Sequence, residues 1–201
     1  PISVADLTNG GVNNNSIIGD VTVETFISRG RKWRFLSIPT NSTQTFRQSW
    51  QEGNAAGANS RPGFGIMISD FNNATYTANG FDYYTPGGPS VKKYNVATQT
   101  YDGIASTLTG SISRVGGYMV YIRGDRSALP TNTLTSSAIL RCKGPLKQGT
   151  QSAISVPANT LVDVGNPFAS PVNMMNIQKP GVQDAYYIWD PRLGGAYGLG
   201  G

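Results

Sequence analysis

The chain contains no histidine and a single cysteine among its 201 residues. Without histidine it cannot form a Ser-His-Asp or Cys-His triad, a histidine-ligated zinc site, or the usual general base that works near neutral pH. The one thiol, Cys142, has no second cysteine in the chain with which to form a disulfide. It ends the strand-like run Ala138–Cys142, which predicts a small buried side chain. Most hydrolase mechanisms are therefore excluded.

Catalysis by paired carboxylates survives these exclusions, because glycoside hydrolases need only two Asp or Glu side chains about 5 to 10 Å apart. The chain offers eleven acidic residues. Several of them lie where strands are expected to end, and aspartate at such places usually closes a turn. We therefore expect no enzyme, and a carboxylate-based glycoside hydrolase is the most distant of the alternatives.

Charged side chains are also scarce, at 13% of the sequence, which is about half of the usual share. Glycine, asparagine, serine and threonine are abundant instead, so water solvates the surface through amide and hydroxyl groups rather than through charges. This composition is typical of extracellular β-rich domains, whereas cytosolic α/β enzymes carry more lysine and glutamate on helices. No stretch reaches the ~20 apolar residues of a membrane-spanning helix. The sequence predicts an extracellular or cell-surface protein with no membrane insertion.

The net charge is +5, and the densest basic cluster is Arg29–Arg34. This cluster interleaves cations with Trp33, a pattern that can meet phosphate or an acidic glycan. Strand alternation gives a simpler interpretation, in which Trp33 and Phe35 face the core while Lys32 and Arg34 face solvent. We favour it because one short cluster lacks the long basic stripe that nucleic acid requires. Nucleic acid is not an expected partner, and attraction to polyanionic surface polysaccharide stays open.

Short runs of β-branched and aromatic residues, separated by Gly, Pro or Asn, predict an all-β fold. The recurring spacing of these runs favours a β-sandwich or jelly roll. The expected strands are Thr22–Ile27, Trp33–Ile38, Gly65–Ser69, Val91–Asn95, Gly117–Ile122, Ser137–Cys142, Thr160–Val164 and Tyr186–Trp189.

One short helix is expected at about residues 42–52, where Phe46 and Trp50 lie four positions apart on one face. Gly53 can end this helix, and Trp50 would anchor it onto the sandwich. A further helical turn can form at 171–177, because a proline at its start suits a first turn.

Two long loop regions, Gly53–Gly63 and Ala78–Pro89, are the expected carriers of a binding site. The second combines aromatic rings, which can stack on sugar faces, with a carboxylate that can accept hydrogen bonds from hydroxyls. In the alternative interpretation, which is slightly favoured, the rings fold back as plugs over the end of the sandwich. Two residues near the C-terminal end complete the candidate ligand-binding set, which is Phe81, Asp82, Tyr83, Tyr84, Trp189 and Asp190.

Calcium is the one cofactor that the sequence raises, because extracellular β modules often bind it through oxygen ligands. Asp70–Asn73 and Asp82 supply such oxygens, but the chain has no dense Asp-x-Asp-x-Asp-Gly loop. The signal for calcium is therefore weak, and we expect no cofactor and no catalytic or metal-binding residue.

The segment Arg123–Asp125 spells the Arg-Gly-Asp tripeptide that integrins bind. A match of three residues is common by chance, and this one directly follows the apolar run Tyr118–Ile122. It most simply predicts the turn that ends a strand.

Six motifs follow one another along nearly the whole chain. They are Gly19–Ile27, Arg31–Pro39, Trp50–Gln51, Gly117–Arg126, Gly165–Ser170 and Tyr186–Pro191. Their order resembles that in modules of very large surface and secreted proteins of the Bacteroidota, which end in a sorting domain for the type IX secretion system. The resemblance implies an exported cell-surface module, without implying any single activity.

Two regions are expected along the chain. Residues 1–18 would be an N-terminal strand and linker from a preceding segment, and residues 19–201 a β-sandwich module that is truncated at its C-terminus. A truncated sandwich has open sheet edges, which invite pairing with another strand. A filament or a strand-complemented assembly is therefore a serious hypothesis.

The favoured function is a non-enzymatic structural or adhesive module that acts through display and protein–protein contacts. Its expected partners are other modules of the same polypeptide or copies of itself. The alternative is a carbohydrate-binding, lectin-like module that recognises a surface polysaccharide. The exposure of the aromatic rings separates the two, because a flat exposed platform favours sugar binding and buried rings favour a scaffold.

Overall fold

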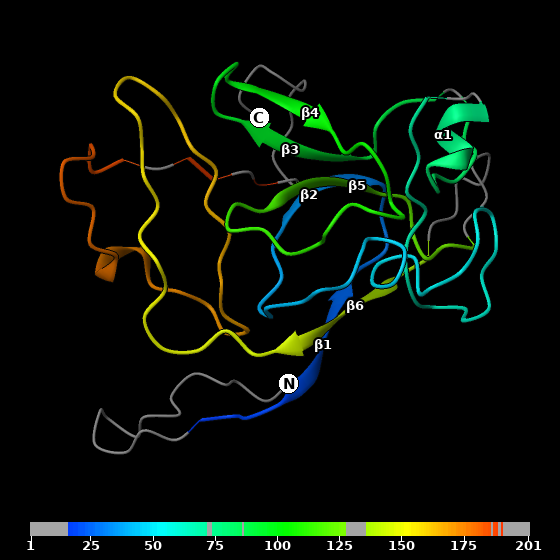
Figure 1. Cartoon of the computed structure of the whole chain (residues 1–201), viewed down its shortest axis with the longest axis horizontal. Helices are drawn as coiled ribbons and strands as arrows, with labels where there is room; N and C mark the ends of the chain where they lie inside the picture. The colour runs from blue at the N-terminus through cyan, green and yellow to red at the C-terminus, as the bar shows by residue number, and fades with distance from the viewer. Residues whose placement is uncertain are drawn as a thin grey trace.

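A computed structural model of the chain describes residues 16–71, 74–85, 87–127, 136–185, 187–188 and 190. Its strands form two antiparallel sheets, which confirms the all-β prediction (Figure 1). The elements in chain order are β1 (Asp20–Ile27), β2 (Lys32–Leu36), the helix α1 (Ala74–Ala78), β3 (Val91–Asn95), β4 (Thr100–Gly103), β5 (Tyr118–Ile122), β6 (Ala138–Pro145) and the 3-10 turn η1 (Met174–Asn176).

The two sheets differ in size. β1 and β6 form a two-stranded sheet, and the other strands form a four-stranded sheet in the order β2-β5-β3-β4. Only β3 and β4 pair with a neighbour in sequence, so the remaining pairs join distant parts of the chain. Figure 1 shows β1 and β6 below the four-stranded sheet, with the segment between β2 and α1 running beside both.

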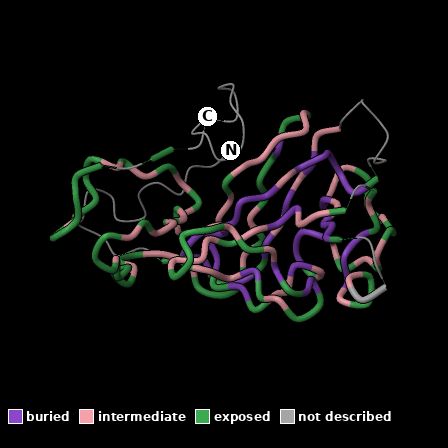
Figure 2. Tube along the Cα trace, turned by 90° about the horizontal axis from the view of Figure 1, so that it is seen from above, coloured by how far each residue is buried: buried purple, intermediate pink, exposed green. Residues whose placement is uncertain are grey.

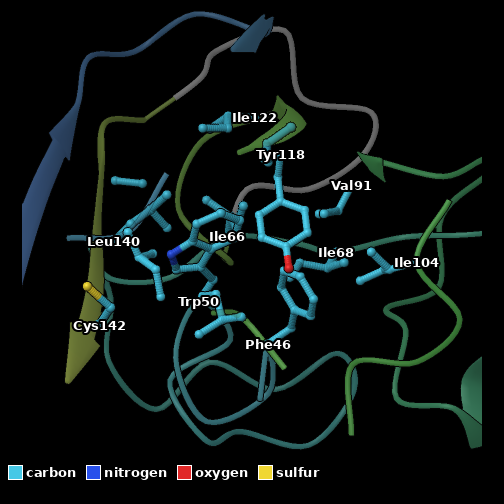
Figure 3. Close-up of a cluster of buried hydrophobic side chains, with 14 of the residues drawn as sticks. Phe46, Trp50, Ile66, Ile68, Val91, Ile104, Tyr118, Ile122, Leu140 and Cys142 are labelled. Carbon is cyan, nitrogen blue, oxygen red and sulfur yellow. The ribbon is translucent and has the colours of Figure 1, made fainter. Parts of the chain in front are cut away.

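The core collects side chains from both sheets and from the connecting segment. Tyr118 and Ile122 of β5 and Leu140 of β6 share it with the fully buried Ile66 and Ile68 (Figure 3). Figure 2 shows that the buried residues gather in one region of the molecule. From residue 147 onward the described residues are all half-buried or exposed. This C-terminal region therefore adds little to the core.

The segment predicted to be a helix, residues 42–52, forms consecutive turns instead. The backbone N–H of Gln51 donates to the carbonyl of Phe46, and that of Gly53 donates to Arg47, so the spacing of a helical ladder is not kept. Phe46 and Trp50 are both buried in the core, as expected for an anchor, but the adjacent Gln51 is buried as well. A surface helix would leave one face in water, whereas this segment is enclosed on several sides.

Five of the expected strands are confirmed within three residues, two form no strand, and one strand was not expected. Gly65–Ser69 is buried but makes only isolated bridges at Phe64 and Ser69. Thr160–Val164 forms no strand, and two of its apolar side chains are exposed because no sheet covers them. β4 was not expected, since its sequence is short and polar. Tyr186 and Trp189, the two ends of another expected strand, lie outside the described residues, as do residues 1–15.

The two helical elements of the described chain are both short. α1 lies in a segment where no helix was predicted. η1 falls inside 171–177, which confirms the expected helical turn there, and the Asn173 side chain caps it by accepting a hydrogen bond from the Met175 N–H. The fold is therefore dominated by strands and turns.

Cys142 lies on β6 and is buried in the core, as its sequence context predicted. Burial raises the pKa of its thiol, and only the thiolate reacts with alkylating reagents. We expect iodoacetamide at pH 8 to alkylate the native protein far more slowly than the protein in 8 M urea, with mass spectrometry as the readout. Equal rates in both conditions would show that the β1–β6 sheet opens readily.

Candidate functional site

The outer face of the four-stranded sheet carries a group of aromatic side chains. Successive residues of a strand point to opposite faces, and Tyr118, Val120 and Ile122 of β5 point into the core. Tyr121 therefore lies on the outer face, and cross-strand partners share that face with it. The residues placed there by the register, which we call the aromatic face, are Trp33, Phe35, Tyr94, Tyr101 and Tyr121.

The rings of the aromatic face contact one another across strands. Trp33 lies directly opposite Tyr121, with ring centroids 5.3 Å apart. Phe35 stacks on Tyr101 at 5.9 Å and an interplanar angle of 26°. Tyr94 approaches the other side of this pair, at 5.0 Å from Tyr101. These contacts form two groups on the same face of the sheet, one between β2 and β5 and the other among β2, β3 and β4.

This arrangement corrects the prediction that Trp33 and Phe35 face the core. Phe35 is 48% exposed, whereas Leu36 packs against the core opposite Tyr118. The predicted alternation of β2 is right, but its phase is reversed. Lys32 and Arg34 share the phase of Leu36, so β2 places its two aromatic residues on one phase and its charged residues with Leu36 on the other. The aliphatic residues fill the core, and the aromatic residues cover the sheet.

A pocket opens at one end of the aromatic face. Its volume is about 260 Å³, and Trp33 and Tyr121 form part of its wall. The loop before β3 closes another side through Tyr84. We call it the arginine pocket, and its lining residues are Trp33, Tyr84, Gly87, Gly88, Pro89, Ser90, Tyr121 and Arg123.

Arg123 is the charged residue of this lining, and it is only 6% exposed. The centre of its guanidinium lies 3.9 Å from the Tyr84 ring centroid and 4.9 Å from that of Tyr121. Its Nε and Nη1 are buried and make no hydrogen bond. Burial lowers the pKa of Arg123, and the charge of Arg31 lowers it further, while the two tyrosines raise it. A buried cation therefore sits beside aromatic rings.

The Arg-Gly-Asp tripeptide is not displayed to solvent. Arg123 and Asp125 are both buried. The Asp125 carboxylate accepts hydrogen bonds from the backbone N–H groups of Gly63 and Ser127. The tripeptide directly follows β5 and ties that strand end to a neighbouring loop, which agrees with the structural interpretation of this sequence.

The structure separates the six residues of the predicted site. Phe81 is a core residue, and Tyr83 is 67% exposed outside the arginine pocket. Tyr84 lines the pocket, and Asp190 is half-buried. Trp189 lies outside the described residues. Among the described residues of the predicted set, only Tyr84 thus meets other aromatic rings at a hollow, and the residues that it meets were not in that set.

The carboxylate of Asp82, which was predicted to bind a ligand, is engaged by partners inside the protein. It is buried and forms an ion pair with Arg126, with Oδ1 and Nη2 2.6 Å apart. Its oxygens also accept hydrogen bonds from the Gly57 and Ile68 N–H groups and from the Gln51 amide. The Asp82 carboxylate therefore makes its hydrogen bonds within the protein, as expected if this loop folds back as a plug.

Arg126 completes this internal network. Its guanidinium donates to the backbone carbonyls of Gln51, Asn54 and Ala55, besides pairing with Asp82. It thereby joins the turns after Trp50 to the end of β5. Buried charges are tolerated when they are paired and fully hydrogen-bonded, and this pair meets both conditions.

Other carboxylates also have internal partners. Glu52 pairs with Arg141 of β6, and Asp163 pairs with Arg114. Burial raises the pKa of Asp70, whose carboxylate also accepts the Phe71 N–H. No three acidic or cysteine side chains gather into a metal-ligand group within the described ranges. The oxygens proposed as calcium ligands thus do not form one group among the described residues. Asp82 pairs with Arg126, and Asn72 and Asn73 lie outside the described ranges.

No protein-family model, curated protein or solved structure matches this chain. The resemblance to exported modules of the Bacteroidota therefore stays a prediction. In the region that the structure describes, no helix has the length and apolar character needed to cross a bilayer. The features that bear on function are the sheet edges, the aromatic face and the arginine pocket.

Proposed function

We propose that the chain is a non-enzymatic structural and adhesive module of an exported cell-surface protein, and that it binds its partners by strand pairing along β1. The observation that carries this proposal is the outer edge of β1. Its partners would be copies of the same module or other modules of the same polypeptide. The extracellular setting is part of the proposal and rests on composition and on the resemblance described above.

The hydrogen bonds of β6 reveal which way the backbone of β1 points. Ile139 of β6 exchanges backbone hydrogen bonds with Gly63 and Gly65, on the side away from β1. The carbonyl of Arg141 accepts a hydrogen bond from Ser49, and the N–H of Lys143 donates to Gln44. These three residues of β6 therefore use backbone N–H or C=O groups to form hydrogen bonds with segments other than β1.

The residues of β1 opposite them must also point away from the pair. In an antiparallel ladder, two facing residues either bond to each other or both direct their N–H and C=O groups outward. Phe26, Glu24 and Thr22 face the three β6 residues. Their N–H and C=O groups consequently line the outer edge of β1.

No described residue pairs with this outer edge. The strand is eight residues long and largely exposed, with Phe26 68% accessible to solvent. A long exposed edge of this kind is a template for another strand. These features support adhesion by strand addition.

The carboxylates support the non-enzymatic part of the proposal. Glu52, Asp82 and Asp163 are held in ion pairs with arginines. The lining of the arginine pocket contains no Asp or Glu. A glycosidase needs two such groups at its cleft, so the pocket is better suited to binding than to hydrolysis.

A proline at an outward-facing position tests the edge. Glu24→Pro removes an N–H that points away from β6, so we expect the fold to persist while self-association is lost. Thr25→Pro is the matched control, because position 25 faces Leu140 in the alternate, hydrogen-bonded pairs of the ladder. It should destabilise the β1–β6 sheet, since proline removes a ladder bond.

Light scattering coupled to size-exclusion chromatography, over a hundredfold range of protein concentration, gives the readout. We expect the parent chain to assemble as its concentration rises and the Glu24→Pro variant to stay monomeric with unchanged circular dichroism. A parent chain that is monomeric throughout, or a variant that assembles equally well, would refute pairing between copies at β1.

A second candidate function is carbohydrate binding, and the aromatic face supports it. Aromatic rings placed side by side on a sheet offer flat apolar surfaces with polar edges, and sugar rings stack on such surfaces. The face differs from the predicted ligand set, since Tyr84 is the one residue of that set that lies at its pocket. A glycan array probed with the labelled chain would test this candidate.

A further inference from the structure

Arg123 differs from Arg126, which is buried to a similar degree, because no carboxylate of the described residues pairs with it. Arg126, Arg114 and Arg141 each form an ion pair with an acidic side chain. Arg123 forms no ion pair with a described residue, and two of its nitrogens make no hydrogen bond. A buried charge without a counter-ion is unfavourable unless something else compensates it. The rings of Tyr84 and Tyr121 offset part of this cost through cation–π contacts.

Further positive charge lies near the same pocket. Arg31 is close enough for its charge to act on Arg123. The Lys92 ammonium lies 5.1 Å from the centroid of Trp33, which is part of the pocket wall. The lining itself contains no acidic residue. Clustered charge of one sign in a hollow with apolar walls attracts a ligand of the opposite sign.

The aromatic walls of the arginine pocket restrict which anions can bind there. The pocket is bounded by Trp33, Tyr84 and Tyr121, so a ligand needs a flat apolar face as well as a negative charge. Inorganic phosphate carries negative charge but has no flat apolar face. The planar fork of an arginine matches a carboxylate in particular, because two parallel N–H groups can donate to its two oxygens.

The size of the pocket restricts the ligand further. Its volume of about 260 Å³ lies below the range of about 300 to 1,000 Å³ that holds drug-sized ligands. One sugar ring suits such a space better than an extended chain. The neighbouring aromatic face, with Phe35 and Tyr101 stacked beside the pocket, can hold the next ring of an oligosaccharide.

We propose that the arginine pocket binds the carboxylate of an acidic sugar residue, such as a uronic acid, with Arg123 facing the carboxylate and Trp33 and Tyr121 against the sugar ring. The proposal rests on carbohydrate binding, the second candidate function above, and names its ligand class. The carboxylate supplies the counter-ion that the described residues do not give to Arg123. A carboxylate on a peptide shares this charge but brings no sugar ring to the aromatic walls.

The test compares two oligosaccharides that differ only at one carbon. Oligogalacturonate carries a carboxylate where oligogalactose carries a hydroxymethyl group, so the pair isolates the charge. Titration of the full chain with each, followed by isothermal calorimetry and by the tryptophan indole signals in NMR spectra, measures both affinities. We expect oligogalacturonate to bind at least tenfold more tightly, and Arg123→Gln to remove that preference.

Arg61→Gln is the matched control, because Arg61 is exposed and lies outside the pocket lining, and the substitution removes the same charge. It should leave binding unchanged. Arg123→Lys keeps the charge but lacks the planar fork, so we expect an intermediate affinity if it folds. Thermal unfolding of each variant shows whether the fold is intact. Should Arg123→Gln not fold, a reduced preference for oligogalacturonate in a folded Arg123→Lys, with Arg61→Gln unchanged, supports the same conclusion.

The remaining outcomes separate the inference from the function on which it rests. Equal binding of the two oligosaccharides would overturn the carboxylate inference while leaving carbohydrate binding intact. Binding of neither, together with a blank glycan array, would overturn both. Equal losses of affinity for oligogalacturonate in Arg123→Gln and Arg61→Gln would show that the ligand is attracted by the net charge of the protein alone. Competition by a glutamate-rich peptide or by inorganic phosphate, as effective as the uronate, would show an anion site with no preference for sugar.

Discussion

Replacing Asp82 with asparagine is expected to lower the free energy of unfolding by about 3–5 kcal/mol, which is the usual cost of leaving one member of a buried ion pair alone. The Arg126 and Asp82 side chains are 1% and 2% exposed, so water cannot screen the charge that is left behind. The substitution keeps the shape of residue 82, removes its charge and replaces one acceptor oxygen with an NH2 group. Urea unfolding followed by tryptophan fluorescence measures the effect.

A double-mutant cycle shows whether the loss belongs to the pair. The Asp82→Asn/Arg126→Met variant should be less destabilised than the sum of its two single variants, because it no longer buries an uncompensated charge. Asp20→Asn is the control, since its pair with Lys143 lies on the surface. It should change stability by less than about 1 kcal/mol. Additive losses in the cycle would contradict a coupled pair.

Trp50→Ala is expected to be about as damaging, with a loss of about 3–5 kcal/mol from the cavity that it creates. Trp50 packs edge-on against Phe46 and Tyr118, with ring centroids 5.7 and 6.0 Å apart, and all three are buried (Figure 3). The close packing of these rings leaves no mobile group to refill the space. Scanning calorimetry and urea unfolding both report the loss.

Tyr83→Ala is the matched control for the cavity. It also removes an aromatic ring, but this ring is mostly exposed, so stability should stay within about 0.5 kcal/mol of the parent. Comparable losses in Trp50→Ala and Tyr83→Ala would show that the enclosed turns at 42–52 are not part of the cooperative core. This comparison also tests whether the loop that carries Tyr83 is more than a surface feature.

The role of Asp82 changes how a binding experiment should be interpreted. Asp82 lies in the loop that was expected to contact sugar, yet its carboxylate holds Arg126 and the Gly57 and Ile68 backbone. Loss of ligand binding in an Asp82 variant would therefore report a damaged loop rather than a lost contact. Substitutions at Arg123 probe the pocket itself, because that side chain lines it.

The strands were largely predictable, since alternation and β-propensity are local properties of the sequence. β3 was expected at Val91–Asn95 and is found there. The structure of residues 42–52 was not predictable in this way, because the spacing of Phe46 and Trp50 fits a helix and a buried set of turns equally well. Burial of Gln51 beside them decides between the two, and burial depends on segments far away in sequence.

The candidate site was harder to predict than the strands. Trp33, Tyr84 and Tyr121 come from three separate segments, and only the pairing of β2 with β5 and the folding of the loop before β3 bring them to one pocket. The order of Trp33, Phe35 and Leu36 contains a partial signal, because the two aromatic residues share one phase of the strand and Leu36 lies on the other. Composition alone could not show which set faces the core.

The sequence by itself determined the absence of histidine chemistry, the β-rich fold class and the positions of most strands. Each follows from residue identity or from the period of two along a strand. Tertiary structure decided the phase of β2, the burial of Asp82 with Arg126, the open edge of β1 and the placement of Arg123 away from the described carboxylates. These depend on the register between distant strands, and the free energy that sets a register comes from side chains that meet only in the folded chain.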